Sequence, residues 1–246
     1  MSYSIQLYTL RDALDADLPG TIAKVAAIGY TQVEPYNFAS IADQLDVALR
    51  ENALTAPSGH APLLSADQDV TFAAAQRLGI STVIQPLHPA QHWQNLEDIK
   101  ATATALNAAA AKAAAYGIRV GYHNHAWELE SVIDGVTALE HLVTYLAPEV
   151  VLEVDTYWAA VGGQNPVELL ARLGDRVRFI HLKDGPATTD TSLQTPLGHG
   201  VIPVWDVIEA ATALEVGVVE FDDYSGDIFE GIAESLTFLQ QGPVTV

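Results

Sequence analysis

The chain has 246 residues, of which 49% are hydrophobic and 17% are charged, so it contains ample apolar material for a substantial core. Its 31 acidic and 11 basic side chains give a formal net charge of -20, which disfavours nucleic acid and anionic lipid surfaces as partners. The absence of cysteine excludes disulfides, thiolate ligands and a cysteine nucleophile, so any metal must be bound through nitrogen and oxygen.

The first residues, MSYSIQLYTLRD, lack both the basic region and the apolar region of a signal peptide. Nowhere does the sequence contain the run of about 18 apolar residues that a membrane-spanning helix requires. We therefore expect a cytoplasmic protein with no membrane segment. Its oligomeric state stays open, with a homo-oligomer as one alternative.

Short runs rich in Val, Ile and Tyr alternate along the chain with longer segments of helical periodicity, which is typical of repeated βα units. The predicted strands cover residues 4–8, 32–36, 54–60, 82–87, 119–125, 150–157, 177–183 and 217–222. The predicted helices cover residues 18–28, 41–52, 66–78, 95–116, 136–146, 166–173, 204–214 and 227–240. Eight alternating pairs without a linker predict an α/β fold, a single (β/α)8 TIM barrel domain over residues 1–246, in preference to an open doubly wound sheet.

Ionisable side chains concentrate at the carboxyl ends of these strands, where barrels of this kind carry their chemistry. Side chains two residues apart in a strand share a face, so four pairs should point the same way. These pairs are His123 with His125, Glu153 with Asp155, His181 with Lys183, and Glu220 with Asp222.

Two imidazoles and two carboxylates brought together from neighbouring strands would destabilise one another unless a cation or a substrate organised them. Such a set of nitrogen and oxygen donors suits a divalent ion such as Mn, Mg, Co or Zn with open positions for substrate. The predicted ligands are His123, Asp155, His181 and Glu220.

Further residues near the predicted mouth are candidates for substrate contact, each with a structural role as the alternative. Glu34 and His60 could bind substrate hydroxyls or transfer protons, and His125 is a second contact from the fifth strand. Trp158 and Tyr8 could offer a ring to a sugar face or pack against the barrel.

The loop "TPLGHGVIPVW" precedes the seventh helix, a place where barrels often bind phosphate. Of the basic side chains, however, only Arg11 and Lys183 fall near the predicted mouth. A phosphorylated substrate would find little charge compensation there, which favours a neutral sugar or keto-sugar.

Seven segments, spread over the whole chain, resemble the xylose-isomerase-like TIM-barrel superfamily of sugar phosphate isomerases and epimerases, which also contains inosose dehydratases. They are "IQLYTLRD", "IGYTQVE", "GYHNHAWELE", "LEVDTYWAAVGG", "RVRFIHLKD", "PLGHGVIPVW" and "VVEFDDY". The resemblance implies a metal held by Glu, Asp, His and Glu from successive strands. Asp155, His181 and Glu220 match the last three, whereas His123 takes the place of the first glutamate.

This replacement makes a simple 3-epimerisation with two glutamates less secure. We therefore predict a metal-dependent isomerase or epimerase of a small carbohydrate, in which Glu220 moves a proton and His125, Lys183 or Glu34 is the matching acid. A lyase or dehydratase acting on a keto-sugar or keto-inositol with the same residues is the alternative. A non-catalytic sugar-binding barrel is a third hypothesis, and an apurinic endonuclease is disfavoured by the net charge.

Overall fold

A parallel barrel forms the centre of the computed structural model, which describes residues 2–242. The eight strands lie in the order β2-β1-β10-β9-β8-β5-β4-β3. The isolated parallel bridges Gln32–Thr55 and Tyr36–His60 join β2 to β3 and bring the two ends of the sheet together. The barrel strands are β1 (Ser2–Gln6), β2 (Gln32–Glu34), β3 (Ser58–His60), β4 (Thr82–Gln85), β5 (Arg119–His123), β8 (Val151–Asp155), β9 (Val177–Leu182) and β10 (Val216–Val219). The predicted (β/α)8 barrel is confirmed.

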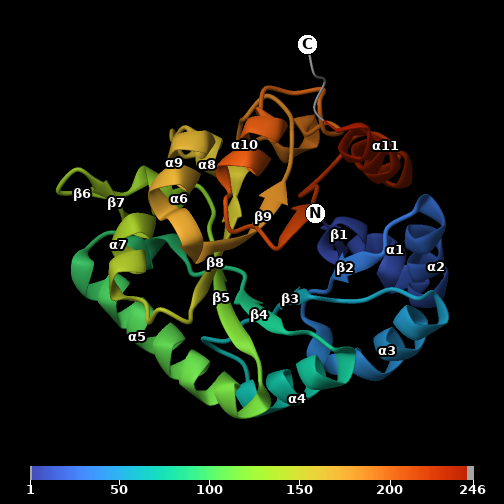
Figure 1. The fold of residues 1–246 in the computed structure, drawn as a ribbon, viewed down its shortest axis with the longest axis horizontal. Helices are drawn as coiled ribbons and strands as arrows, with labels where there is room; N and C mark the ends of the chain where they lie inside the picture. The colour runs from blue at the N-terminus through green and yellow to red at the C-terminus, as the bar shows by residue number, and fades with distance from the viewer. Residues whose placement is uncertain (1, 243–246) are drawn as a thin grey trace.

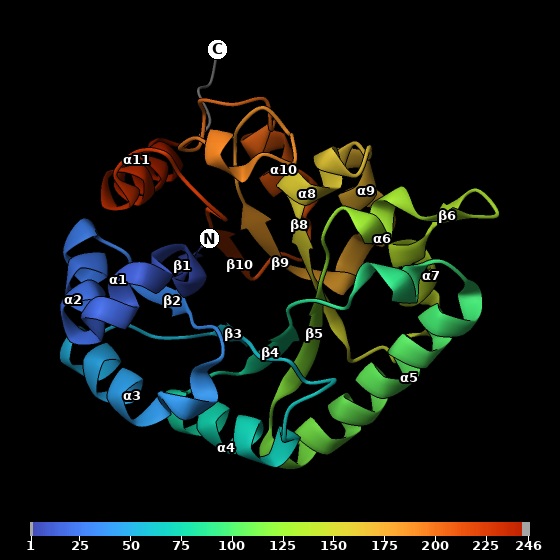
Figure 2. The ribbon, with the colours of Figure 1, turned by 180° about the vertical axis from the view of Figure 1, so that it is seen from behind.

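Helices surround the barrel and face solvent on their outer side (Figures 1 and 2). The main helices are α2 (Leu18–Ile28), α3 (Ala42–Glu51), α4 (Gln68–Leu78), α5 (Leu96–Ala113), α7 (Ala138–Tyr145), α9 (Pro166–Leu173), α10 (Val204–Ala210) and α11 (Ile228–Gln241). Side chains of Asp17, Asp67, Asn95, Asn165 and Asp227 cap the N-termini of five of them, as the capping preference of Asp and Asn requires.

Two predicted strands extend too far because a side chain at the true strand end begins a helical turn. Gln6 accepts a hydrogen bond from the Tyr8 backbone N–H, and the 3-10 helix η1 (Leu7–Leu10) follows. Asp155 accepts from the Trp158 backbone N–H at 2.8 Å and begins helix α8 (Thr156–Val161). Polar strand ends in this barrel are therefore also helix caps.

Other differences from the prediction are local. The predicted strand over residues 54–60 shortens to β3 because Pro57 lacks the N–H that a ladder needs. Short elements that the sequence pattern did not predict are α1 (Arg11–Ala16), α6 (Trp127–Glu130) and the hairpin of β6 (Val132–Ile133) with β7 (Val136–Thr137).

The half of the barrel interior nearer the amino ends of the strands, the lower half, contains an apolar cluster that we call the plug. Five buried side chains form a cluster of their own, apart from the large core between the strands and the helices. They are Ile84, Val151, Phe179, Val216 and Val218. This apolar plug lies below the polar side chains at the carboxyl ends of the strands.

None of the helices within residues 2–242 combines the length and the apolar character that crossing a bilayer would take.

Candidate metal and active site

Polar side chains fill the barrel directly above the apolar plug because inward positions recur every second residue. On β9 the inward series runs from Phe179 through His181 to Lys183, and on β8 it includes Glu153 and Asp155. All five side chains are buried. The predicted pairing of side chains two residues apart is thus what carries these groups into one volume.

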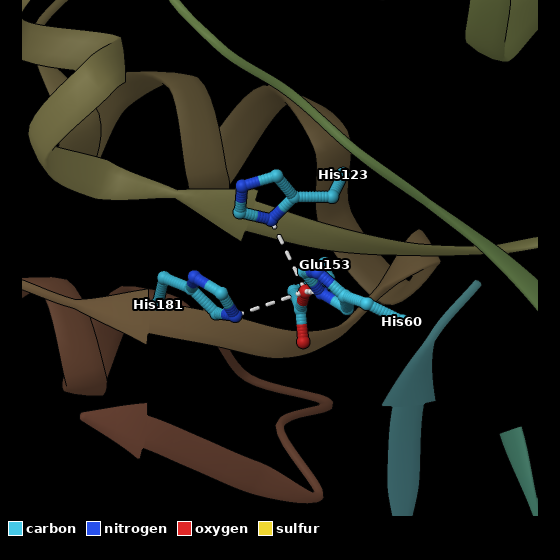
Figure 3. A group of neighbouring side chains, drawn as sticks. All are labelled: His60, His123, Glu153 and His181. Carbon is cyan, nitrogen blue, oxygen red and sulfur yellow. Dashed lines mark hydrogen bonds and ion pairs between the residues drawn. The ribbon is translucent and has the colours of Figure 1, made fainter. Parts of the chain in front are cut away.

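The deeper layer contains an inner group, which we define as His60, His123, Glu153 and His181 (Figure 3). All three imidazoles turn a nitrogen toward Glu153 Oε2, with His60 Nε2 at 2.5 Å, His181 Nε2 at 3.0 Å and His123 Nδ1 at 3.1 Å. The four residues are buried, and Glu153 Oε1 has no hydrogen-bond partner in the described structure. Such a set of donors is chemically suited to a divalent metal.

Glu34 lies against the inner group and does not line the cavity above it. Gln6 Nε2 donates to Glu34 Oε1 at 2.8 Å, Ser58 Oγ donates to Glu34 Oε2, and His181 Nε2 is 3.0 Å from Oε1. Burial and the neighbouring Glu153 raise the pKa of Glu34. The structure therefore places this predicted catalytic residue below the substrate space, 3.3 Å from His60 Nε2.

The upper layer contains an outer group, which we define as Asp155, His181 and Glu220. His181 Nδ1 is 2.6 Å from Glu220 Oε2, so this imidazole faces the inner group with one nitrogen and the outer group with the other. His123 does the same, because its Nε2 is 3.7 Å from Asp155 Oδ2. Three of the four predicted metal ligands thus form the outer group, whereas His123 belongs to the inner group and lies beside Asp155.

Lys183 occupies the centre of the carboxylates in the upper layer. Its Nζ is 2.6 Å from Glu220 Oε2 and 2.8 Å from an oxygen of both Asp155 and Asp222. Burial alone would lower the pKa of Lys183, but Asp155, Asp222 and Glu220 raise it well above its usual value. Lys183 therefore remains a cation at neutral pH.

The same contacts set the charge of the two outer carboxylates. Burial would raise the pKa of Glu220, but Lys183 and His181 hold it well below its usual value. Burial raises the pKa of Asp155 to about 6 against the opposing effect of Lys183. Glu220 is thus a carboxylate at neutral pH and can accept a proton.

A cavity of about 300 Å³ opens above these groups, at the lower end of the range for small-molecule sites. Tyr8 and Tyr36 form one wall, with ring centroids 5.3 Å apart and planes at 88°. The lining residues are Tyr8, Tyr36, Asn37, His60, Pro86, Leu87, His123, His125, Glu220 and Asp222. The cavity therefore joins an aromatic and apolar wall to a polar floor.

Three of the four predicted substrate contacts, Tyr8, His60 and His125, line this cavity. Trp158 does not; its ring centroid lies 5.9 Å from Lys183 Nζ, and it packs beside the charged layer. The His125 ring stacks on Trp127 with centroids 4.5 Å apart. Burial lowers the pKa of His125 to about 4, so its imidazole is neutral and unsuited to be the acid that the sequence offered as one alternative.

Sequence reasoning assigned no role to Glu153 or to Glu128. Glu153 could have been found from its position two residues before Asp155, which places both side chains on the same face of the strand. Glu128 accepts from the His125 backbone N–H at 2.9 Å and from the Tyr122 hydroxyl at 2.7 Å, and so fixes the turn after β5. Burial raises the pKa of Glu128 to about 8.

The glycine loop considered for phosphate binding is occupied by the chain's own carboxylate. Asp184 Oδ2 accepts from the backbone N–H groups of Gly198 and Gly200, each at 2.9 Å. Its Oδ1 accepts from Gly185 at 2.9 Å and from Ile202 at 3.0 Å. These backbone N–H groups therefore already donate to Asp184 and are not free to bind a phosphate.

A barrel with buried imidazoles and carboxylates at the carboxyl ends of its strands defines the class of protein as a (β/α)8 barrel with a candidate metal site. The family described as xylose isomerase-like TIM barrel matches residues 22–241, and the chain belongs to it.

Among curated proteins, the chain is similar to an inosose dehydratase of Geobacillus kaustophilus (strain HTA426), with 36% identity over 93 residues. That segment is 37% of this chain and spans only 27% of the relative. Among solved structures, a sugar phosphate isomerase/epimerase of Parabacteroides distasonis ATCC 8503 has a TM-score of 0.83 and 22% identity, covering 98% of this chain and 94% of that one. The IOLI protein with a bound zinc atom has a TM-score of 0.76 and 15% identity, covering 98% and 97%. These two likenesses show the fold.

Proposed function

We propose that the protein catalyses metal-dependent proton transfer on a small neutral sugar or keto-sugar, as an isomerase or epimerase. The observation that carries this proposal is the position of Glu220. It lies at the floor of the cavity, next to the buried donors, and Lys183 and His181 hold it as a carboxylate. A carboxylate placed there can take a proton from a carbon of a bound sugar and return it.

The proposed cofactor is a divalent ion, Mn, Mg, Co or Zn, held by Asp155, His181 and Glu220, with His123 as the fourth predicted ligand beside them. Bound there, the metal would polarise neighbouring hydroxyl and carbonyl oxygens and lower the pKa of the C–H group between them. The zinc atom of the IOLI structure supports a metal in this fold.

The chain's own residues would divide the remaining work. Glu220 moves the proton, and Lys183 keeps Glu220 and Asp155 charged and fixed. Glu34 is the second group proposed to move protons, from its place below the cavity beside His60 and His181. His60 and His125 bind hydroxyls, and the Tyr8 ring packs on a sugar face. Trp158 shields the ammonium of Lys183.

Two observations support a neutral substrate. The cavity-lining residues include no Lys or Arg within the part of the chain that the structure describes. The amides of the glycine loop are taken by Asp184. We also propose that the protein acts in the cytoplasm, without nucleic acid or membrane as a partner.

Elimination of water from a keto-sugar or keto-inositol is the second candidate. It is favoured by the likeness to an inosose dehydratase and by the presence of His123 where two-base epimerases would have a glutamate. The same carboxylate, Glu220, would then remove the proton next to the carbonyl.

The test is a mass-spectrometric screen of sugars, keto-sugars and keto-inositols with protein loaded with each metal. An isobaric product that gains deuterium in D2O indicates isomerisation, whereas loss of water with a UV-absorbing enone indicates elimination. We expect Glu220→Gln to lower kcat by about 10² to 10⁴-fold. Glu234→Gln, at an exposed carboxylate, is the matched control and should not change it.

Two results would contradict the proposal. A strong preference for phosphate esters over free sugars would overturn the substrate class. Sugar binding without turnover by any metal form, unchanged in Glu220→Gln, would instead identify a non-catalytic sugar-binding barrel.

A further inference from the structure

The charge of the polar layers exceeds what one divalent metal can balance. Five carboxylates surround these layers, and four of them are almost completely buried. They are Glu34, Glu153, Asp155, Glu220 and the partly exposed Asp222. Across residues 2–242, Lys183 is the one Lys or Arg that pairs with any of them. With the metal of the proposed function in the outer group, Lys183 and that metal balance Asp155, Glu220 and Asp222. Glu34 and Glu153 are left to be balanced by the imidazoles of His60 and His181 or by a second cation.

We propose that the inner group binds a second divalent cation, through His60 Nε2, His123 Nδ1 and Glu153. This inference rests on the proposed function, because it adds a cation to the one in the outer group. The three donors already converge: Glu153 Oε2 is 2.5 Å from His60 Nε2 and 3.1 Å from His123 Nδ1. Tetrahedral ligands at about 2.0–2.1 Å from a zinc ion lie about 3.4 Å from one another, so binding needs donor shifts of less than about 1 Å.

A second observation points to a ligand in this place. Glu153 is fully buried, and its Oε1 has no hydrogen-bond partner in the described structure. Buried carboxylate oxygens are normally paired, because an unpaired one loses its hydration without compensation. A cation beside Glu153 would compensate the carboxylate as a whole.

The orientation of the shared imidazoles allows two cations without an imidazolate. His123 would use Nδ1 for the inner cation, which leaves Asp155, His181 and Glu220 as the ligands of the outer one, and its Nε2–H faces Asp155 with 3.7 Å between the heavy atoms. His181 would use Nδ1 for the outer cation, and its Nε2–H, 3.0 Å from Glu34 Oε1, donates to that carboxylate. Each histidine then has one nitrogen on a metal and the other on a carboxylate, the usual arrangement around metal-binding histidines.

The inner position is also accessible from outside. His60 and His123 line the cavity, so a water molecule or a substrate oxygen entering there can complete the coordination of the inner cation. The cation would hold both imidazoles in place and neutralise the layer beneath the reacting carbon.

The test is the metal stoichiometry of the full-length protein, stripped with a chelator, reloaded with Zn²⁺ and freed of unbound metal. We expect two ions per chain in the wild type and one in both His60→Gln and Asp155→Asn. His199→Gln, which removes an exposed imidazole paired with Glu234, is the matched control and should keep two. Loading with Co²⁺ gives a second readout, because His60→Gln should reduce the visible absorption of the imidazole-bound ion and weaken its binding at least about 100-fold.

The outcomes separate the inference from the proposed function. One ion per wild-type chain that persists in His60→Gln and disappears in Asp155→Asn overturns the inner site and leaves the outer metal intact. One ion per wild-type chain that disappears in His60→Gln and persists in Asp155→Asn supports the inner site and contradicts the outer ligand set. Absence of any bound ion overturns both. A wild-type count of two supports the inner site, and a count of zero overturns it, even if a variant fails to fold. For a count of one, Glu153→Gln provides a second variant of the inner group.

Discussion

The lower and upper halves of the barrel interior are built on the same strands with the same two-residue period, yet they have opposite character. Below, Phe179, Val216 and Val218 belong to an apolar plug. Above, the next inward positions carry His181, Lys183 and Glu220, all buried. Apolar filling stabilises a fold directly, whereas buried charges are costly unless they are paired. The plug therefore serves stability, and the upper half is where we propose binding and chemistry.

The largest effect on folding is expected from Phe179→Ala in the plug. Removing a fully buried aromatic side chain should lower the free energy of unfolding by about 4 kcal/mol, because the packed barrel cannot close the space. Urea denaturation measures this change. Turnover per folded molecule should be unchanged, and a specific loss of turnover would contradict the division between the two halves.

Lys183→Met tests the upper half. We expect a loss of about 3 kcal/mol in the free energy of unfolding, because three carboxylates lose their cation. Lys112→Met is the matched control. Its ion pair with Asp69 is exposed, so the loss should be far smaller than that of Lys183→Met. Equal losses in the two variants would show that the buried ammonium has no special role.

Glu128→Gln tests how a buried carboxyl group near the upper half makes the free energy of unfolding depend on pH. Burial raises the pKa of Glu128 to about 8 in the folded chain, from a usual value of 4.5. The folded state therefore keeps a proton that the unfolded chain releases above its own pKa, and the stabilisation is lost as pH rises toward 8. From pH 5.5 to 7.5 the wild type should lose about 2 to 3 kcal/mol of unfolding free energy relative to the variant. The same difference in unfolding free energy between wild type and variant at both pH values, measured by urea denaturation, would contradict this prediction.

The smallest effect is expected at the rim. Tyr8→Leu should raise KM about fivefold with little change in kcat, because it removes a ring from the cavity wall but no reacting group. Tyr145→Leu is the matched control. The Tyr8 ring lies beneath Arg11 and the Tyr145 ring beneath Lys100, but Tyr145 is outside the cavity. Steady-state kinetics on the substrate found in the screen would show the difference.

Much of this architecture could be predicted from the sequence because alternation fixes which face a strand residue occupies. That logic placed Glu153 beside Asp155 and His181 beside Lys183. Alternation could not predict how far along the barrel axis each side chain lies. Glu34 was predicted near substrate but lies below the cavity, because height in a barrel depends on the stagger between neighbouring strands.

The residues of the cavity wall also could not be predicted from the sequence. Tyr36, Asn37 and Leu87 come from loops after different strands, and no periodic pattern relates them. Strand ends were predicted too late at Gln6 and Asp155 because their side chains fold back on the next turn. Such local hydrogen bonds compete with the extended backbone and leave little trace in hydrophobic periodicity.

The carboxylate of Asp184 has a consequence for the loop that follows β9. It fills a ring of four backbone N–H groups, from Gly185, Gly198, Gly200 and Ile202, that would otherwise attract an external anion. Asp184 directly follows Lys183, so the loop and the buried ammonium share one peptide link. Without the carboxylate at position 184 these four N–H groups would lose their acceptor, and the segment from Gly198 to Ile202 would lose its attachment to the turn after β9.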